Sequence, residues 1–472
     1  MGRMLTIDPV TRIEGHARVA LDLDDAGGIT RADLIVNELR GFERILVGME
    51  AEKMPQITAR ICGVCPSAHH LAAVKALENA LGVDPPPAAK LMRELLYMGH
   101  FIHSHTLHLF VLAGPDLVLG LDGDPAKRNI VGVVEAVPEV ALKALRLRSL
   151  GQKLNELIGG RGVHPVTAII GGMSFDLDEQ KLAAATALVD EALELALELA
   201  TVAKDLINAQ ATAHPALLTD LQQPTWYMGT VKGGKVNFYD GRLRVIDDTG
   251  MVRAEFDAPE YGTYLAERTV ESSYLKPVFM NVDGQEHVYR VNTLARMNVA
   301  EGMETPKAQS WFEAFRKGLG WPCHLTVPHN YARIIELIYA CEKAKEIVSD
   351  PAVLGSARIP VTMKAGHGVG HVEAPRGSLF HEYEIDDNGI VQAANLIVAT
   401  QQNYSSINTS ILQAAQVFVA GRGEDAILNA VEFAIRSYDP CLSCATHAVG
   451  RMPLIVEMRR NGETVHLMRR DA

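Results

Sequence analysis

The sequence carries two Cys-x-x-Cys pairs near its opposite ends, and these pairs constrain any fold that the chain can adopt. The first pair is Cys62 and Cys65, and the second is Cys441 and Cys444. Thiolates are soft ligands that suit nickel, zinc, copper(I) or the iron of iron–sulfur clusters. A Cys-x-x-Cys turn can direct both of its sulfurs at one metal. The sequence therefore predicts that the two ends of the chain meet, with four thiolates at one buried point.

Two such pairs most often hold a structural zinc ion, with four thiolate ligands. The spacing argues against that interpretation, because the pairs of a zinc ribbon lie about 15–20 residues apart, whereas these bracket nearly the whole chain. Each pair also lies in apolar, helix-forming sequence. A structural zinc site with four cysteines does not need the polar side chains that flank these pairs, which are Arg60, His69, Asp439 and His447. On the residues alone, a zinc-stabilised structural subunit stays an alternative.

The composition sets broad limits on partners and location. A length of 472 residues allows two or three average domains, and a net charge of −12 argues against a nucleic-acid partner. No apolar run reaches the roughly 18 residues of a membrane span, because Gly114-Pro115-Asp116 interrupts the richest run. The first residues do not resemble a signal peptide, and the cysteine pattern suits a reducing compartment. We therefore expect a cytoplasmic protein.

Hydrophobic periodicity predicts an α+β fold, predominantly helical, with a central bundle of long helices and small peripheral antiparallel sheets. Helices are expected over residues 66–81, 88–113, 126–158, 177–210, 304–348 and 424–436. Strands are expected as a hairpin or meander within residues 5–40, in a β-rich subregion at 226–300, and at 390–400. We expect residues 1–447 to form one unit. A C-terminal extension follows at 448–472, where Asn461-Gly462 is typical of a hairpin turn.

The two cysteine signatures resemble those of the large, catalytic subunit of [NiFe] hydrogenases, which read R-x-C-G-x-C-x-x-x-H and D-P-C-x-x-C-x-x-H. Every fixed position is matched, at residues 60–69 and 439–447. The resemblance implies reversible, heterolytic cleavage of H2 at a nickel–iron centre whose iron carries two cyanides and a carbon monoxide. It also implies that Cys62 and Cys441 are terminal nickel ligands, and that Cys65 and Cys444 bridge the two metals.

The same resemblance implies roles for residues outside the cysteine pairs. Glu14 would relay a proton from a nickel-bound cysteine, while Arg376, Asp116 and Asp439 would form a canopy above the open side of the metals. Arg376 and Thr400 would donate hydrogen bonds to the cyanides. We favour Glu14 as the proton acceptor, because a guanidinium, with a solution pKa above about 12, is a poor base.

A magnesium ion is implied deeper in the protein. Magnesium is a hard cation that prefers oxygen ligands and water, and the ligands in the family pattern would be Glu43, His447 and the backbone carbonyl of Leu396. The chain departs from many family members nearby, with Ala399 and Gln402 where they carry a proline and a tryptophan. That departure bears directly on the donor role of Thr400.

Electrons must leave through other chains. No iron–sulfur run remains once four cysteines are assigned, and Gly366–Gly370 lacks the strand–turn–helix context of a dinucleotide loop. An iron–sulfur small subunit is therefore the minimum partner, with further electron-transfer subunits. The ends of the chain look most like the cytoplasmic, bidirectional branch of the family, which couples H2 to NAD(P), a deazaflavin coenzyme, ferredoxin or a heterodisulfide reductase. The resemblance also implies an endopeptidase that cuts after His447. An H2-sensing regulator with the same centre is the alternative function.

Other potential ligands are interpreted as packing residues. Four histidines on the helix predicted at 88–113 have helical spacing; they are His100, His103, His105 and His108. A second metal site is conceivable there, but no Glu or Cys is interleaved as in H-E-x-x-H, so we prefer packed, hydrogen-bonded histidines. Cys323 and Cys341 are interpreted as buried free cysteines.

Overall fold

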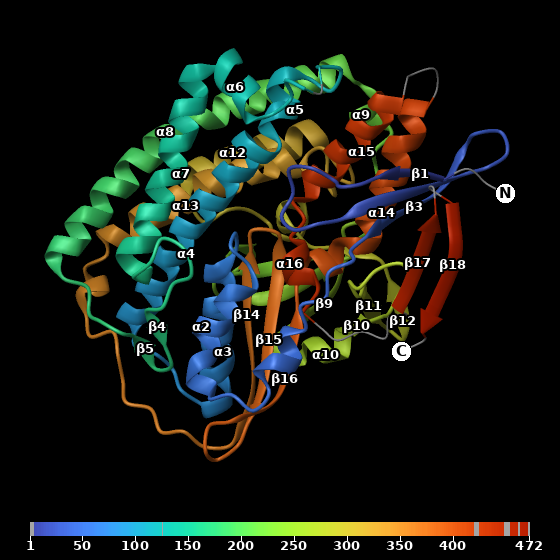
Figure 1. Ribbon diagram of the computed structural model, residues 1–472. Coiled ribbons are helices and arrows are strands. Elements are labelled where there is room, and N and C mark those ends of the chain that lie inside the picture. Colours follow the sequence, from blue (N-terminus) through green and yellow to red (C-terminus); the bar gives the residue numbers. More distant parts are fainter. Residues whose placement is uncertain (1–3, 125, 420–423, 448–453, 461–462, 471–472) are drawn as a thin grey trace.

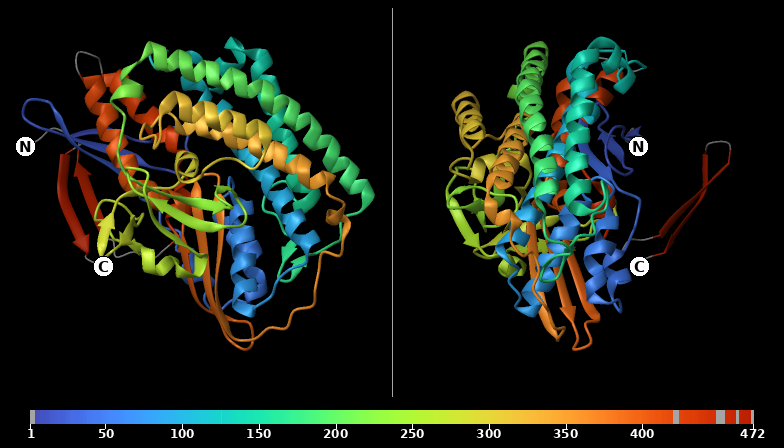
Figure 2. Two further views of the ribbon diagram at one scale, coloured as in Figure 1. Left: turned by 180° about the vertical axis from the view of Figure 1, so that it is seen from behind. Right: turned by 90° about the vertical axis from the view of Figure 1, so that its left-hand side faces the viewer.

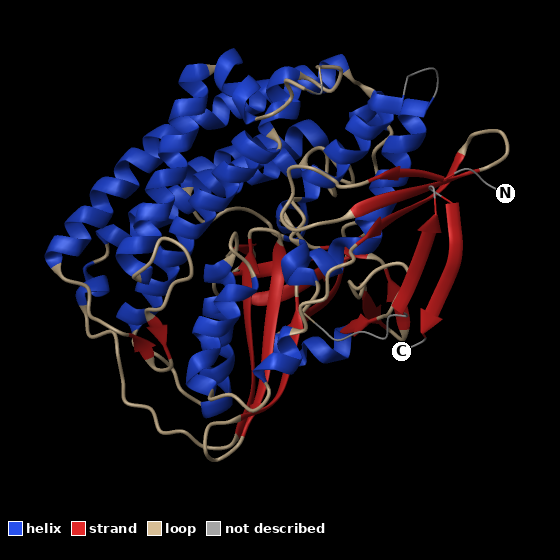
Figure 3. Cartoon of the chain, in the orientation of Figure 1, coloured by secondary structure: helices blue, strands red, loops and turns tan. Residues whose placement is uncertain are grey.

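The computed structural model describes residues 4–124, 126–419, 424–447, 454–460 and 463–470 (Figure 1). The fold is α+β and mainly helical, as predicted. Long helices gather on one side of the molecule, and short sheets lie beside them (Figure 3). None of the described helices is long and apolar enough to cross a membrane.

The helical layer is built from long helices that run side by side (Figure 2). They are α4 (Pro87–Leu107), α7 (Pro138–Gly159), α8 (Glu179–Ala213), α12 (Pro306–Leu319) and α13 (His329–Ser349). Helix α4 packs against α7 and α13, and α8 packs against the same two helices. The helix predicted over 126–158 is instead two, α6 (Ile130–Ala136) and α7, because the chain breaks before Pro138. The helix predicted over 304–348 is likewise divided between α12 and α13.

The two β-rich regions that the sequence predicts are both present. The N-terminal meander consists of β1 (Met4–Ile7), β2 (Arg18–Leu23) and β3 (Ile29–Ile35). The subregion at 226–300 holds two sheets, β13-β6-β8-β9 and β10-β11-β12, in which only the β13–β6 pair is parallel among the described pairs. Their strands are β6 (Trp226–Lys232), β7 (Lys235–Val236), β8 (Arg242–Ile246), β9 (Val252–Phe256), β10 (Leu265–Glu267), β11 (Val278–Val282), β12 (Gln285–His287) and β13 (Tyr289–Arg290).

A further sheet lies against the helix that follows the first cysteine pair. It is antiparallel, in the order β14 (Gly366–Ala374), β15 (Gly377–Ile385) and β16 (Val391–Ile397), and β14 packs on α3 (Pro66–Leu81). Alternate residues of β14 are glycines, and a Cβ on Gly366, Gly368 or Gly370 would lie 2.2 Å from the backbone of α3. Gly366–Gly370, which lacks the context of a dinucleotide loop, is therefore part of a strand. Its glycines allow the backbone of α3 to approach the strand closely.

The C-terminal helices carry the second cysteine pair. The strand predicted at 390–400 ends at Ile397, and α14 (Ala399–Val419) begins two residues later, so Thr400 lies in its first turn. Helix α15 (Glu424–Tyr438) packs on α14 and leads into α16 (Leu442–Ala445). Beyond it, β17 (Leu454–Arg460) and β18 (Glu463–Arg470) pair as the predicted antiparallel hairpin. The predicted turn at Asn461-Gly462 lies outside the described residues.

Short elements complete the described chain. The short helices are α1 (Phe42–Leu46), α2 (Met54–Thr58), α5 (Gly114–Leu119), α9 (Ala216–Thr219), α10 (Tyr261–Tyr264) and α11 (Thr293–Val299). A small pair of strands, β4 (Ala168–Ile169) and β5 (Gly172–Met173), lies beside α3 and α4. Cys323 and Cys341 are buried and free, as predicted.

Candidate metal centre

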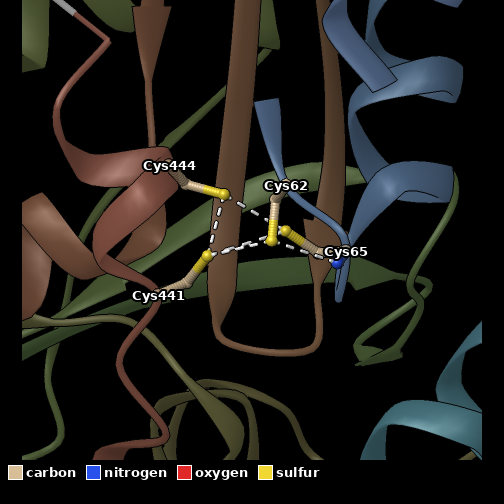
Figure 4. Close-up of side chains that lie close together, drawn as sticks. All are labelled: Cys62, Cys65, Cys441 and Cys444. Carbon is tan, nitrogen blue, oxygen red and sulfur yellow. Dashed lines mark hydrogen bonds between the residues drawn. The ribbon is translucent and has the colours of Figure 1, made fainter. Parts of the chain in front are cut away.

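The four paired cysteines converge on one buried point (Figure 4). The sulfur of Cys441 lies 3.3 Å from that of Cys62, 4.0 Å from that of Cys65 and 2.9 Å from that of Cys444. The sulfurs of Cys65 and Cys444 are 3.2 Å apart. All four ligand atoms lie within 4.8 Å of one another. The predicted meeting of the two chain ends is therefore confirmed.

Local backbone geometry directs each pair of sulfurs inward. The backbone N–H groups of Val64 and Cys65 donate to the Cys62 sulfur at 3.2 and 3.4 Å, and Pro66 then begins α3. At the other end, Asp439 has a left-handed backbone, with φ of 54°, which ends α15 and turns the chain toward Cys441. These local features direct the two sulfurs of each pair toward the same point.

The four cysteine sulfurs influence one another's ionisation. Hydrogen bonds from the other three sulfurs, with Cys441 first, lower the pKa of Cys62 well below its usual value. Burial raises the pKa values of Cys441 and Cys444 well above theirs. A metal that takes all four as thiolates must displace the remaining protons.

Arg376 and Asp439 line the edge of the sulfur cluster. The Arg376 guanidinium donates to the backbone oxygen of Asp439 at 2.7 Å and to its carboxylate at 3.0 Å. A small cavity of about 20 Å³ is bounded by Arg376, Thr400 and three of the four cysteines, all except Cys62. Burial alone would lower the pKa of Arg376, but the charges of Asp439 and of the cysteine sulfurs raise it well above its usual value. The side chain therefore stays a charged donor.

Glu14 lies directly against the second cysteine pair. Its carboxylate oxygen is 3.1 Å from the Cys441 sulfur and accepts the backbone N–H of Ser443 at 3.0 Å. Burial, followed by the negative charge of Cys62, raises the pKa of Glu14. Since its side chain is only partly buried, Glu14 contacts the sulfur at one end and approaches solvent at the other. Such a carboxyl group takes up a proton more readily than a fully solvated one, and it can pass that proton on toward solvent.

The residues predicted to hold magnesium also lie together. The Glu43 carboxylate is 2.8 Å from His447 Nδ1 and accepts the backbone N–H of Leu396 at 2.8 Å. His447 Nε2 lies 2.7 Å from the side-chain oxygen of Gln401, a residue that the sequence analysis did not name. A carboxylate, an imidazole, an amide oxygen and a nearby backbone carbonyl form a donor set compatible with a cation that keeps several of its waters.

Asp116 is held by three arginines. Its carboxylate is buried and pairs with Arg12 at 2.5 Å, Arg436 at 2.9 Å and Arg128 at 3.3 Å. Arg12 precedes Glu14, and Arg436 precedes Cys441, so Asp116 joins the two chain segments that carry the site. Its place in a canopy above the metals stays a prediction.

The four histidines of the helix predicted at 88–113 are packed in the interior, as predicted. Three of them lie on α4, and His108 begins the π-helical turn His108–Leu112 that follows it. All four are buried; His105 lies 2.9 Å from Glu336, and His108 lies 2.6 Å from the backbone oxygen of Arg436. Within the described residues, only the four paired cysteines form a group of three or more His, Cys, Asp or Glu side chains that could share one metal ion.

Comparison with known proteins decides the family. The family described as nickel-dependent hydrogenase matches residues 40–131 and 255–447, and a family described as HoxL-like matches residues 4–39. This chain belongs to the nickel-dependent hydrogenases. It is an enzyme, a [NiFe] hydrogenase large subunit, and the zinc-stabilised structural subunit is no longer a viable interpretation.

Relatives of this hydrogenase chain match over nearly their full length. The matching chain of the F420-non-reducing hydrogenase vhu of Methanococcus voltae is 46% identical, over 88% of this chain and 99% of the relative. The NAD-reducing hydrogenase HoxS subunit beta of Cupriavidus necator is 37% identical, over 97% of each chain. The crystal structure of an NAD+-reducing [NiFe]-hydrogenase in the H2-reduced state superposes with a TM-score of 0.89, at 34% identity, over 94% of this chain and 99% of that one.

The donor set of this hydrogenase fits a nickel–iron centre. Four thiolates are the ligands that nickel and low-valent iron prefer. One N–H-bearing nitrogen of Arg376, Nη1, is buried and has no hydrogen-bond partner among the described residues. Thr400 accepts the backbone N–H of Cys441 at 2.8 Å, which leaves its own hydrogen free to donate. Both Arg376 and Thr400 can therefore donate hydrogen bonds to polar ligands of a metal inside the cavity.

Proposed function

We propose that this subunit cleaves H2 heterolytically, with Glu14 as the group that takes the proton away from Cys441. The observation that supports this best is the 3.1 Å contact between the Glu14 carboxylate and the Cys441 sulfur. The nickel–iron centre, when bound, supplies the position at which H2 is polarised. Glu14 then moves the proton from the sulfur toward solvent, and Arg376 stabilises charge as a fixed cation.

The two cysteine signatures support an assignment of the individual cysteines. Following the family pattern, we assign Cys65 and Cys444 to the bridge between nickel and iron, and Cys62 and Cys441 to terminal positions on nickel. The cavity is lined by Cys65, Cys441 and Cys444 and not by Cys62, which is compatible with this assignment. Cyanide and carbon monoxide on the iron would occupy the cavity, where Arg376 and Thr400 can donate hydrogen bonds to the cyanides.

A magnesium ion is proposed beside the centre. Glu43, His447 and the carbonyl of Leu396 are its ligands in this proposal, and Gln401 is a further neighbour through its contact with His447. The convergence of these residues from three distant parts of the chain supports the assignment. A magnesium analysis of the purified enzyme, before and after Glu43→Ala, tests it.

Electrons are proposed to leave to an iron–sulfur small subunit, then to further electron-transfer subunits. The chain has six cysteines in all, and the two outside the centre are buried and free, so it has no set of thiolates for a cluster of its own. The relatives are named as F420-non-reducing and NAD-reducing hydrogenases. We therefore propose a cytoplasmic complex whose final acceptor is not F420.

Maturation is proposed to remove the tail. An endopeptidase would cut after His447 and release residues 448–472 as a C-terminal extension of the single domain at 1–447. The position of His447, at which its side chain already contacts Glu43 and Gln401, supports a C-terminus that closes over the site. Mass spectrometry of the mature chain tests this.

The decisive experiment combines elemental analysis, infrared spectroscopy and turnover on the complex with its small subunit. We expect nickel and iron, infrared bands of CO and CN stretching, and rapid H2-dependent reduction of viologen. Zinc without these bands would contradict the proposal. Intact bands with very slow turnover would identify an H2 sensor instead of a catalyst. Comparing NAD+ with F420 as acceptor then tests the partner assignment.

A further inference from the structure

Three buried side chains form a hydrogen-bonded row behind Cys444. His69 Nε2 lies 3.2 Å from the Cys444 sulfur, and His69 Nδ1 lies 3.0 Å from His381 Nε2. His381 Nδ1 in turn lies 2.7 Å from the Tyr383 hydroxyl. The three side chains belong to residues that are at most 1% exposed, so water does not compete for these contacts.

The row follows from the packing of α3 on β15 (Figure 1). His381 and Tyr383 are two residues apart on β15, so their side chains lie on the same face of the strand. His69 lies in the first turn of α3, four residues after Cys65. Glu382, between them on the strand, contacts Tyr261 and His367 instead. The strand register therefore directs two consecutive same-face residues to the back of one cysteine.

Both histidines in the row are neutral, because both rings are buried and their hydrogen-bond partners among the described residues include no carboxylate. Burial raises the pKa of Tyr383, so the phenol keeps its hydrogen. A neutral imidazole has one N–H and one acceptor nitrogen. The hydrogens of the row can therefore point in only two directions, all toward the Cys444 sulfur or all away from it.

The protonation state of Cys444 determines in which of these two directions the hydrogens point. If Cys444 is a thiol, its S–H can donate to His69, and every hydrogen in the row can point away from the sulfur. If Cys444 is a thiolate, it can only accept. The His69 hydrogen must then be on Nε2, the His381 hydrogen on Nε2, and the Tyr383 hydroxyl must donate to His381 Nδ1.

We propose that Tyr383 and His381 are positioning residues that hold His69 in the tautomer whose Nε2–H donates to the Cys444 thiolate, an inference that rests on the proposed function. Tyr383 is the terminal donor in this arrangement, because its hydroxyl satisfies His381 Nδ1 when the His381 hydrogen is on Nε2. Without the hydroxyl, the Nε2–H form of His381 loses that hydrogen bond, so the preference that orients the row toward Cys444 is weakened. Outer hydrogen bonds of this kind tune the electron density at a bound metal.

The test is Tyr383→Phe, which removes only the hydroxyl. In the complex with its small subunit, we expect unchanged nickel and iron content. We also expect a shift of the CO and CN stretching bands to lower frequency and a more negative midpoint potential, because the sulfur loses a hydrogen bond and donates more charge. Tyr339→Phe is the matched control, since Tyr339 is fully buried and donates to Glu304 at 3.0 Å instead. Parent-like bands in the loaded Tyr383→Phe enzyme would overturn the proposal.

Substitutions at His381 separate hydrogen bonding from packing. The amide of His381→Gln can donate to His69 and accept from Tyr383, so we expect bands close to those of the parent. His381→Leu has neither group and should shift the bands as far as Tyr383→Phe does. Equal shifts in both His381 variants would show that packing alone acts, and would refute the positioning role.

A second readout does not depend on hydrogenase activity. Zinc bound to the four cysteines of the full chain also makes Cys444 a thiolate, and nitrogen NMR shifts report the tautomer of His69. We expect the Nε2–H tautomer in the parent and a mixture in Tyr383→Phe; the same single tautomer in both would exclude the proposed role. If the complex lacks CO and CN bands altogether, the proposed function fails, while the zinc-loaded chain still tests the row.

Discussion

The carboxylate of Glu14 and the sulfur of Cys441 lie 3.1 Å apart, although they come from opposite ends of the chain. The backbones also meet there, since Leu442 N–H donates to the Glu14 carbonyl at 3.1 Å and an isolated parallel bridge joins Glu14 to Cys441. The site is therefore complete only when both terminal segments are docked.

The first prediction concerns the proton. Glu14→Gln keeps an oxygen that can accept the Ser443 N–H but loses the carboxylate that takes a proton. We expect viologen reduction with H2 to fall by about 10²–10⁴-fold, with unchanged nickel and iron content. Glu52→Gln, on an exposed residue, is the control and should leave the rate unchanged. A Glu14→Gln enzyme that exchanges H2 with solvent protons at the parent rate would rule out the relay.

The second prediction separates the two roles considered for Arg376. Arg376→Lys replaces a guanidinium with a group of lower intrinsic pKa, which is a better base but cannot make both contacts to Asp439. If Arg376 acts as a fixed cation, the rate should fall at least about tenfold at every pH. A rate that recovers to the parent level as pH rises would instead assign proton transfer to this position.

The third prediction uses two glycines with similar backbones. Gly15 and Gly27 have φ of 79° and 84°. A Cβ on Gly15 would lie 2.9 Å from Leu442 Cβ, whereas one on Gly27 would meet no described atom within 4 Å. We expect Gly27→Ala to reduce the free energy of unfolding by about 1 kcal/mol and Gly15→Ala by about 2–4 kcal/mol, with less bound nickel in Gly15→Ala.

Urea unfolding and nickel analysis of the Gly15→Ala and Gly27→Ala variants check this prediction. The difference between the two variants isolates the contact between the terminal segments, because the backbone strain is common to both. Equal losses would mean that the close approach at Leu442 contributes nothing to docking.

The fourth prediction concerns stability in acid. The Ala168 N–H donates to His70 Nε2 at 3.1 Å, and His70 Nδ1 lies 2.9 Å from the Pro55 carbonyl, so the ring must be neutral. Burial lowers the pKa of His70 to about 4, while the unfolded chain has an ordinary value near 6.5. Between these values the unfolded state binds more protons, so the free energy of unfolding rises with pH.

This stabilisation is complete above about pH 6.5 and is lost as the pH falls toward about 4. We expect the urea midpoint to be lower at about pH 5 than at about pH 7. In His70→Gln the dependence should be weaker, because the amide donates and accepts without titrating. An unchanged dependence in that variant would assign the acid sensitivity to other groups.

Part of the site could be predicted from local sequence. The cysteine pairs, Glu14, Glu43 and His447 stand within short motifs, and in the structure Glu14 lies beside Cys441 and Glu43 beside His447. The spacing of two ligands along one turn is a local property. A pattern of a few residues therefore encodes this spacing, independently of how the rest of the chain folds.

Other contacts depend on the register between distant elements. Asp116 stands in a motif, yet its partners are three arginines from separate segments. Gln401 meets His447, and Tyr383 stands behind Cys444 through two histidines, only because β15, β16 and α3 pack in one register. No local pattern carries that information.

The sequence by itself determined which atoms can bind the metals, because thiolate chemistry and the two-residue spacing of each pair are written into the chain. Only the tertiary structure decided what surrounds those sulfurs. The glycines of β14 have no side chains, so α3 packs against this sheet at backbone distance. That packing brings His381 and Tyr383 of the neighbouring strand β15 behind Cys444.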